Sequence, residues 1–397
     1  MFFQRRLASR FCGINLLVLP RRAIIVSTSV WAERVWTNKQ QIASRLADRG
    51  FEVIYVEPPR PFVSIWFRER RPRSTFVDVK ANLKLLPSLP ALPFQHKLPP
   101  VAAWNFGAVA RKLRRFIEAT GFRPFILWIY TPLAWSLVGK LGEAVSCYDC
   151  VDDYTAFPRA WSKVVAYCER KLLRGVDIVF ATSKKLFTSK ARLHPDVHYV
   201  PNVADYELFS RSRDPDLATP GELLDLPRPV LGFIGAFNYK IDGSILEHLA
   251  KRGYSVVIVG PVVRDAGFLE RYGSVRFVGK KDPSELPAYL KAFDVCLIPY
   301  VIDRYTESVL PLKLFEYFAS GKPVVATPFG EMRDYSHLVD LGETPDQFEQ
   351  AVKRALSEPK ERAGLRIEEA KKHTWDKRID TMLELLTKKL EDKGGGA

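Results

Sequence analysis

Residues 303–328, DRYTESVLPLKLFEYFASGKPVVATP, are the most informative stretch of this chain. The apolar spacing predicts a helix over 311–320, since Pro suits a first helical position, where its missing N–H would have no partner. Gly321 then provides a C-cap. The runs 324–327 and 295–299 are short, apolar and partly β-branched, which is typical of buried parallel strands. The stretch therefore predicts a strand, a loop, a helix and a strand of an open α/β sheet.

Three polar residues of this stretch form a candidate binding site. In open α/β sheets, ligands bind beyond the carboxyl ends of the strands, and this places Glu307, Lys313 and Glu316 around one crevice. Lys313 and Glu316 are three residues apart and share a helix face. A cation, a carboxylate and a helix N-terminus suit a ligand with phosphates and hydroxyls, such as a nucleotide-sugar. Lys-x-x-Glu is commonly a solvated surface pair, but the apolar residues on the other faces of the helix favour a buried pair that needs partners.

The positive charge of the chain lies in its N-terminal half. The 397 residues have a formal net charge of +15, and there is room for two domains of ordinary size. Residues 1–210 contain 32 Lys and Arg against 16 Asp and Glu, whereas residues 211–397 contain 28 against 29. A field of one sign implies an anionic partner, which leaves a membrane surface, a nucleic acid or an acidic polymer open.

The cysteine content and the N-terminal sequence indicate the cellular compartment of the protein. The five cysteines include one Cys-x-x-Cys, at 147 and 150, without a second pair or a histidine at ligand spacing, so zinc is not expected. Sparse cysteines suit a reducing compartment. The apolar run 11–19 is shorter than the roughly 20 residues that span a bilayer. A signal peptide is disfavoured, because no small-residue cleavage site follows. Residues 1–22 are expected to be a leader that is poorly ordered or bound to a membrane surface.

Alternating strand and helix patterns divide the rest of the chain into two doubly wound domains. The opening 23–59 reads as a βαβ unit that lacks a glycine-rich phosphate loop. Residues 210–229 are rich in Pro and Asp and are expected to be a linker. The expected domains are therefore 23–209 and 230–372, followed by a C-terminal helix and tail at 373–397.

Two segments of the first half combine basic and bulky apolar residues. They are 60–76 (RPFVSIWFRERRPRSTF) and the predicted helix 101–116, with apolar Val101, Trp104, Phe106, Val109 and Phe116. A basic helix is often only a solvated face. Two such segments in one basic half favour docking on an anionic membrane, where apolar residues insert and cations pair with lipid phosphates. No nucleic-acid-binding motif is present, so nucleic acid is not an expected partner.

A second group of polar residues follows the predicted strand 144–148. Asp149, Asp152 and Asp153 come where that strand would end, at the mouth of a crevice. They are candidate substrate contacts. A turn or a helix cap explains aspartates at such positions equally well.

Several segments together resemble a known enzyme class. In the second half they are FIGAFNYKID (233–242), RFVGKKDPSELPAYLKAFDVCLIPY (276–300) and LPLKLFEYFASGKPVVATP (310–328). In the first half they are WAERVWTNKQQIASRLADRGFEVIYVEPP (31–59), YDCVDDY (148–154), VDIVFATS (176–183) and VPNVAD (200–205). The chain resembles the GT-B glycosyltransferases and, more narrowly, glycosyltransferase family 4, which retains anomeric configuration. The resemblance implies two Rossmann-like domains facing a cleft, with the C-terminal helix crossing back to the first domain.

The resemblance also implies roles for individual residues. Glu316 would accept hydrogen bonds from the ribose, and Glu307 would be its catalytic partner near the transferred sugar. The loop 308–312 would offer backbone N–H groups to the donor. Further donor contacts would come from the turn after the first strand of the second domain and from the region near the base, which adds these residues to the site: Gly235, Asn238, Lys240, Gly279, Lys280, Ser308, Pro311 and Leu312.

This chain departs from the family pattern at three points. Eight residues, not seven, separate Glu307 from Glu316, so the resemblance leaves the register of Glu307 open. Ala236 occupies the position of an arginine that often follows the first-turn glycine, so Lys313 and Lys240 are expected to supply the cationic charge. The catalytic-loop histidine has no evident counterpart, and Asp152 or Asp153 lies in that region.

The resemblance implies a glycosyltransferase that uses a nucleoside-diphosphate sugar. The expected acceptor is a polyprenyl-linked or surface glycan, at the cytoplasmic face of the cell membrane. No cofactor or divalent metal is expected, because lysines and helix amides would stabilise the leaving diphosphate. Two alternatives stay open: a nucleotide-sugar epimerase on the same architecture, and a catalytically inactive relative that still binds nucleotide. The sequence does not identify the sugar, the base, the linkage or the oligomeric state.

Overall fold

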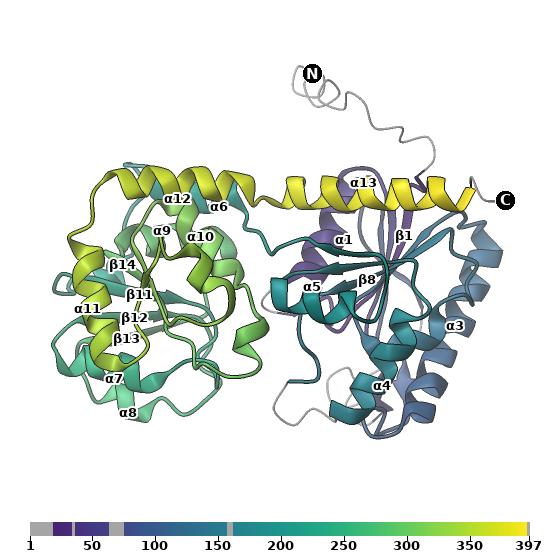
Figure 1. Cartoon of the computed structure of the whole chain (residues 1–397), viewed down its shortest axis with the longest axis horizontal. Helices are drawn as coiled ribbons and strands as arrows, with labels where there is room; N and C mark the ends of the chain where they lie inside the picture. Colours follow the sequence, from purple (N-terminus) through teal and green to yellow (C-terminus); the bar gives the residue numbers. More distant parts are fainter. Residues whose placement is uncertain (1–18, 34–35, 63–74, 157–161, 395–397) are drawn as a thin grey trace, which may run out of the picture. The chain divides into compact units, whose positions relative to one another are not determined.

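A computed structural model of the chain describes residues 19–33, 36–62, 75–156 and 162–394. The described residues fall into two compact units (Figure 1). The first comprises the chain up to Thr182, then Leu186–Val200 and the residues from Ile379 onward; the second comprises Ser183–Lys185 and Pro201–Arg378. Most of the predicted leader, and residues 63–74 of the predicted basic segment 60–76, lie outside the described part.

The first unit is built on an eight-stranded sheet in the order β10-β9-β8-β7-β1-β2-β5-β4. All neighbours are parallel except β4 and β5. Its central strands are apolar on both faces, as expected for a parallel sheet covered by helices. The strands are β1 (Arg22–Val26), β2 (Glu52–Val56), β4 (Val77–Lys80), β5 (Leu83–Leu86), β7 (Ile126–Ile129), β8 (Val145–Cys150), β9 (Ile178–Ala181) and β10 (Val197–Tyr199). A separate two-stranded ribbon pairs β3 (Arg60–Pro61) with β6 (Pro90–Ala91).

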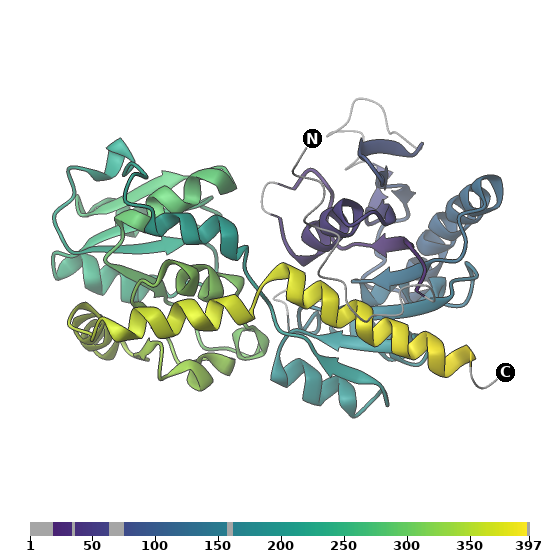
Figure 2. The same ribbon diagram turned by 90° about the horizontal axis from the view of Figure 1, so that it is seen from above.

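Helices connect these strands as crossovers. They are α1 (Asn38–Asp48), α3 (Pro99–Thr120), the 3₁₀ helix η1 (Pro132–Leu137), α4 (Ser162–Leu173) and α5 (Lys184–Ala191). The long C-terminal helix α13 (Trp375–Gly394) continues the chain back onto this unit (Figure 2). Three ion pairs hold it there, Asp380–Arg49 at 2.6 Å, Lys389–Asp196 at 2.7 Å and Lys393–Asp177 at 2.8 Å. The predicted return of the C-terminal helix to the first domain is confirmed.

The second unit has a six-stranded, fully parallel sheet in the order β13-β12-β11-β14-β15-β16. Its strands are β11 (Val230–Ile234), β12 (Ser255–Val259), β13 (Val275–Gly279), β14 (Val295–Ile298), β15 (Val324–Ala326) and β16 (Asp340–Leu341). Its α-helices are α6 (Tyr206–Ser210), α7 (Gly243–Lys251), α8 (Gly267–Glu270), α9 (Leu286–Ala292), α10 (Leu312–Ser320), α11 (Pro345–Leu356) and α12 (Glu361–Lys372). The short 3₁₀ turns include η5 (Thr306–Ser308) and η6 (Gly330–Tyr335). The prediction of two doubly wound sheets is confirmed.

The division between the units lies earlier than the predicted linker at 210–229. That segment carries Leu223 and Leu226, which are buried in the core of the second unit. Its Pro-rich composition marks short 3₁₀ turns packed on the domain, and the chain changes unit at Val200–Pro201. Burial of these apolar residues explains why a polar-looking segment belongs to a folded unit.

Among the described residues, no helix is both long enough and apolar enough to cross a bilayer. Cys147, Cys150, Cys168 and Cys296 are free and buried, as scattered core thiols.

Candidate functional site

The candidate site lies where the order of strands reverses in the second sheet, between β11 and β14. These neighbours are paired at only two positions, Leu231 with Val295 and Gly232 with Cys296. Beyond them the backbone N–H of Ile234 donates to the hydroxyl of Tyr317 from α10, at 2.9 Å. The strands thus separate before their carboxyl ends, and such a switch point is where open α/β sheets bind ligands.

Two glycines form the floor of this opening. Gly235 follows β11 with φ +145°, and Gly260 follows β12 with φ +149°, both in a region that side chains rarely adopt. A Cβ built on Gly260 would overlap the carbonyl oxygen of Gly235. The two turns therefore pack backbone against backbone, and the N–H of Gly235 donates to Val259 at 2.8 Å.

The ammonium group of Lys313 lies beside this floor. A Cβ added to Gly235 would come within 3.1 Å of Lys313 Nζ. Nζ donates to the hydroxyl of Tyr300 at 2.5 Å, and it lies 4.7 Å and 4.9 Å from the ring centres of Phe233 and Tyr300. Among the described residues Lys313 has no ion-pair partner. A partly buried cation held by rings and a phenol is suited to receive an anion.

The N-terminus of α10 adds backbone donors to the same place. Pro311, which the sequence predicted as the first helical residue, is instead the N-cap, one position before the helix begins at Leu312, and it has no N–H. Within the described part of the chain, the N–H groups of Leu312 and Lys313 have no acceptor, as is normal for a first helical turn. Ser308, which the resemblance placed in the donor-binding loop 308–312, already donates within the protein. Its N–H and its hydroxyl both bond to the carbonyl oxygen of Tyr305, at 2.9 and 2.6 Å.

Glu316 lies one turn along α10, partly buried and, among the described residues, without a hydrogen bond or an ion pair. Burial raises its pKa to about 7, nearby Lys313 lowers that pKa, and Asp205 raises it. An unpaired carboxylate in such a place is costly unless a ligand pairs with it. Lys313 and Glu316 therefore lie three residues apart on one helix, as the sequence predicted. Glu316 is partly buried and is not a solvated surface residue.

Lys240 lies in the loop between β11 and α7. Its ammonium donates to the hydroxyl of Tyr305 at 2.9 Å and lies 4.3 Å from the centre of that ring. The oxygen of the Asn238 side chain accepts from the N–H of Lys240 at 3.0 Å, so it shapes this turn. The carbonyl of Lys240 accepts from Val301 at 2.7 Å, which ties the loop to the chain after β14.

Glu307, in η5, is held by two partners. Its carboxylate accepts from Arg333 at 3.2 and 3.4 Å and from the N–H of Gly330 at 3.3 Å. These contacts hold Glu307 against η6. Gly279 ends β13 with φ +70°, and the adjoining Lys280 is exposed.

Asp152 and Asp153 belong to the first unit, just after β8. The carboxylate of Asp153 accepts from the N–H and the hydroxyl of Thr155, at 3.0 and 2.6 Å. For Asp153, that is the turn-forming role which the sequence left open.

Sequence reasoning missed four residues of the site: Gly260, Tyr300, Tyr305 and Tyr317. The sequence offered a signal only for Tyr300 and Gly260, because each directly follows a predicted strand and so lies at a carboxyl end. Tyr305 and Tyr317 take part in the site only through contacts with residues that the strand order brings close to them.

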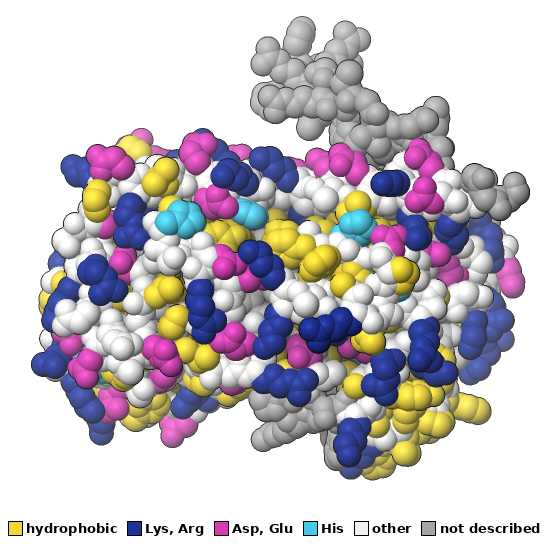
Figure 3. Space-filling model, viewed as in Figure 1, with side chains coloured by type: hydrophobic (Ala, Val, Ile, Leu, Met, Phe, Trp, Pro, Cys, Tyr) yellow, Lys and Arg dark blue, Asp and Glu magenta, His cyan; other side chains and the backbone are white. Residues whose placement is uncertain are grey.

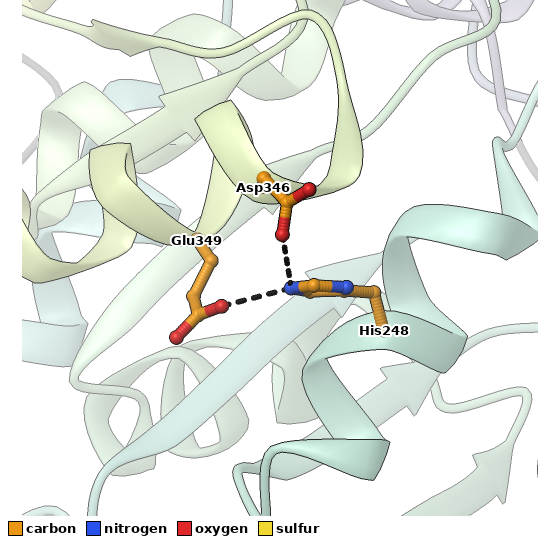
Figure 4. Close-up of side chains that lie close together, drawn as sticks. All are labelled: His248, Asp346 and Glu349. Carbon is orange, nitrogen blue, oxygen red and sulfur yellow. Dashed lines mark hydrogen bonds and ion pairs between the residues drawn. The ribbon is translucent and has the colours of Figure 1, made fainter.

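One cluster outside this site has the composition of a metal site (Figure 4). His248 Nε2 lies 2.8 Å from Glu349 Oε2 and 3.6 Å from Asp346 Oδ1. Glu349 also pairs with Lys353 at 2.7 Å and Arg252 at 3.3 Å. Because Arg252 and Lys353 already pair with Glu349, their charge disfavours a divalent ion there. The cluster is best explained as a link between α7 and α11.

Comparison with known proteins agrees with this geometry. The family described as Glycosyl transferases group 1 matches residues 228–358, which include β11 to α11 and the whole candidate site. This segment is similar to the glycosyl transferases group 1 domain. The matched segment makes up the larger part of the second unit, and its ends lie close to the predicted boundary at 230 and to the end of α11.

A Bacillus subtilis (strain 168) protein, whose provisional name is teichuronic acid biosynthesis glycosyltransferase TuaH, is 30% identical over 234 residues. The match covers 53% of this chain and 58% of that protein, so the chain spans little more than half the length of this relative.

Solved structures show the fold over nearly the whole chain. Sucrose-phosphate synthase of Thermosynechococcus elongatus has a TM-score of 0.69 at 16% identity, covering 92% of this chain and 98% of its own. An E. coli trehalose-6-phosphate protein bound with UDP-2-fluoro glucose has a TM-score of 0.66 at 12% identity, with 92% and 99% covered. Anabaena HepE in complex with UDP and glucose has a TM-score of 0.58 at 14% identity, covering 92% of this chain and 98% of its own. The chain has the GT-B fold, as its resemblance predicted.

Proposed function

We propose that the protein is a retaining glycosyltransferase whose group 1 domain binds a nucleoside-diphosphate sugar. The observation that carries this proposal is the position of Lys313. Its ammonium, which has no ion-pair partner among the described residues, lies beside Gly235, and it comes from the first turn of α10, where the N–H groups of Leu312 and Lys313 have no acceptor in the same part of the chain. This set suits a diphosphate, and Glu316 on the same helix suits the hydroxyls of the ribose.

In the proposed reaction the diphosphate leaves as negative charge grows on its oxygens. Lys313, Lys240 and the amino end of α10 would stabilise that charge. We infer that a departing phosphate oxygen accepts the proton of the incoming acceptor hydroxyl, with no protein nucleophile. Because these groups provide the positive charge, we expect transfer to persist in EDTA, and loss of activity restored by Mg²⁺ would contradict this.

The acceptor and the location are also proposals. The similarity to a protein named for teichuronic acid biosynthesis supports a surface polysaccharide or a lipid-linked precursor as acceptor. The excess of Lys and Arg in residues 1–210 supports attachment to the inner face of the cell membrane.

Calorimetric titration with UDP, GDP, ADP and dTDP, and with their sugars, tests the donor site. Two of the similar structures contain UDP or a UDP-sugar, so UDP is the first to try. We expect one of these diphosphates to bind, and Lys313→Met to weaken it. If none binds to the folded protein, the proposal is wrong.

A catalytically inactive nucleotide-binding relative is the second candidate, because Glu307 is engaged by Arg333 and by the N–H of Gly330. An active enzyme should lose transfer when Glu307→Gln is introduced while still binding donor. Donor binding without transfer in both wild type and variant would favour the inactive relative. Formation of an epimer from donor alone would instead favour the epimerase.

A further inference from the structure

Five large apolar side chains are exposed around the start of α3 in the first unit. Each is between 50 and 65% exposed, and they are Phe62, Leu92, Phe94, Leu98 and Trp104. The pairing of β3 with β6 sets Pro61 opposite Ala91, which brings Phe62 next to Leu92. Leu98 is the N-cap of α3, and Trp104 lies in its second turn. We call these five side chains the α3 patch.

A buried side chain fixes the loop that carries the α3 patch. Asn105 is 2% exposed, accepts from the N–H of Leu92 at 2.9 Å and donates to its carbonyl at 3.0 Å. It also donates to Gln95 at 3.1 Å, and Gln95 in turn donates to Pro59 at 3.2 Å. The apolar side chains are therefore presented by a hydrogen-bonded loop that Asn105 fastens to the helix.

Phe94 is held in an unfavourable conformation. Its φ is +67°, a left-handed value that is rare for a bulky residue and costs about 1–3 kcal/mol. The residue is 59% exposed, so little packing offsets that cost. The other described non-glycine residue with positive φ is Asn82, a type that tolerates it. Such strain in an exposed aromatic residue is typical of a functional position.

Charge accompanies the α3 patch along the same helix face. Trp104, Arg111 and Arg115 are seven and four residues apart, so they share one side of α3, and all three are exposed. Lys97 Nζ lies 5.0 Å from the centre of the Phe94 ring. Phe106 and Val109, which the sequence interpretation placed at a membrane, lie on the opposite face and are buried in the core. In Figure 3 hydrophobic side chains gather with Lys and Arg on the lower right of the view, where α3 and α4 lie in Figure 1.

We propose that the α3 patch inserts into an anionic lipid bilayer, with Lys97, Arg111 and Arg115 pairing with lipid phosphates. Aromatic and leucine side chains beside cations are the composition of interfacial membrane contacts. The basic excess of residues 1–210 makes the charge complementary to that surface. The proposal rests on the proposed function in one respect, since a lipid-linked acceptor explains why such an enzyme would dock there.

Flotation of the full chain with phosphatidylcholine vesicles, with and without 30% phosphatidylglycerol (about a third anionic lipid, enough for a strong surface potential), tests the proposal. We expect binding to the anionic vesicles only. Phe94→Ser with Trp104→Ser should reduce the bound fraction at least about tenfold, given the hydrophobic transfer of two aromatic side chains. Arg111→Gln with Arg115→Gln should weaken binding and reduce its salt dependence. Leu365→Ser, an equally exposed residue of the second unit, is the matched control and should bind as wild type.

Several outcomes would overturn the proposal. Equal binding by wild type and the Phe94, Trp104 double variant would exclude the patch as the contact. A fall in molecular mass for that variant, in lipid-free gel filtration, would assign the patch to a second copy of the chain. Titration of nucleoside diphosphate without lipid separates this test from the proposed function: vesicle binding without any donor binding would refute the glycosyltransferase proposal and leave the lipid contact standing.

Discussion

The two sheets of this protein have the same strand order at their centres, and they differ at the point where that order reverses. In the first sheet β1 and β7 are paired at four positions, from Ala23–Ile126 to Val26–Ile129, and Tyr130 continues the ladder by donating to Val26 at 2.9 Å. In the second sheet β11 and β14 are paired at two positions only. One sheet stays closed at its switch point, and the other opens.

The turns that follow the first strand of each sheet explain the difference. After β1 the hydroxyl of Ser27 bonds to Tyr55 at 2.6 Å and accepts from Ser29 at 2.9 Å, so side chains fill the turn. After β11 the turn contains Gly235, which leaves space for the ammonium of Lys313. The proposed anion site therefore belongs to the second sheet, where backbone replaces side chains at the switch point.

The largest effect should come from Gly260→Ala. Its Cβ would overlap the Gly235 carbonyl, which is backbone and cannot move aside, so we expect the second unit to lose on the order of 4 kcal/mol or more. Urea unfolding with hydrogen exchange localised to 230–260 measures this. Gly253→Ala is the control, since its Cβ meets nothing within 4 Å and positive φ alone costs about 1–2 kcal/mol. Equal losses of unfolding free energy in the two variants would contradict the view that backbone packing at Gly260 sets the second sheet apart from the first.

Lys313→Met should come next, with donor diphosphate binding about 100-fold weaker, because a charge-assisted contact to phosphate is worth up to about 3 kcal/mol. Stability without ligand should change little, since no ion pair is lost. Calorimetric titration of the diphosphate checks this, with the exposed Lys360→Met as control. Unchanged binding by Lys313→Met would mean that the opening of the second sheet is not the donor site.

Glu316 should make both stability and donor affinity depend on pH. Its pKa is raised to about 7 in the folded protein, so the folded state binds the proton more tightly than the unfolded state does. The resulting stability is present below pH 4.5 and declines as pH rises through 7. Above pH 7 the variant Glu316→Gln should therefore melt at a higher temperature than wild type, and at pH 4 it should not.

Donor affinity should move in the opposite direction. If the ribose hydroxyls bind the ionised carboxylate, affinity falls as pH drops below 7, by up to about tenfold per pH unit. Glu316→Gln should bind weakly at every pH, with a flatter profile. A wild-type profile that matches the flat profile of the variant would contradict the assignment of Glu316 to the ribose.

The smallest effect should be that of Tyr305→Phe, which removes the acceptor that positions Lys240 and leaves the ring in place. A hydrogen bond from a charged donor is worth about 1.5 kcal/mol or more, so we expect kcat/KM to fall about tenfold. Tyr167→Phe in the first unit is the control. A fall larger than that of Lys313→Met would mean that Lys240 and Tyr305, rather than α10, dominate the site.

Much of the fold could be predicted from local sequence. Gly321 caps α10 with φ +74°, and β14 and β15 lie within one residue of their predicted ends, because caps and apolar runs are local signals. The strands β4 and β5 and the helices α11 and α12 were missed. β5, Leu83–Leu86, has a lysine in its middle, and its pairing with β2 and β4 makes it a strand.

The candidate site could be predicted only in part. Lys313 and Glu316 were found because their spacing on one helix is fixed by helical geometry. Their surroundings depend on residues far away in sequence, such as Phe233 and Tyr300 around the ammonium group. The engagement of Glu307 by Arg333 likewise joins two loops that no periodicity connects.

The sequence by itself determined the two doubly wound sheets, the helix at 312–320 and the pair of charges on one face of it, since each follows from spacing within a few residues. Only the tertiary structure decided that the second sheet opens between β11 and β14, that Gly260 lies against Gly235, and that Phe94 and Trp104 face solvent while Phe106 faces the core. The physical reason is that burial and strand pairing join residues tens of positions apart, and the free energy of those contacts has no local signature.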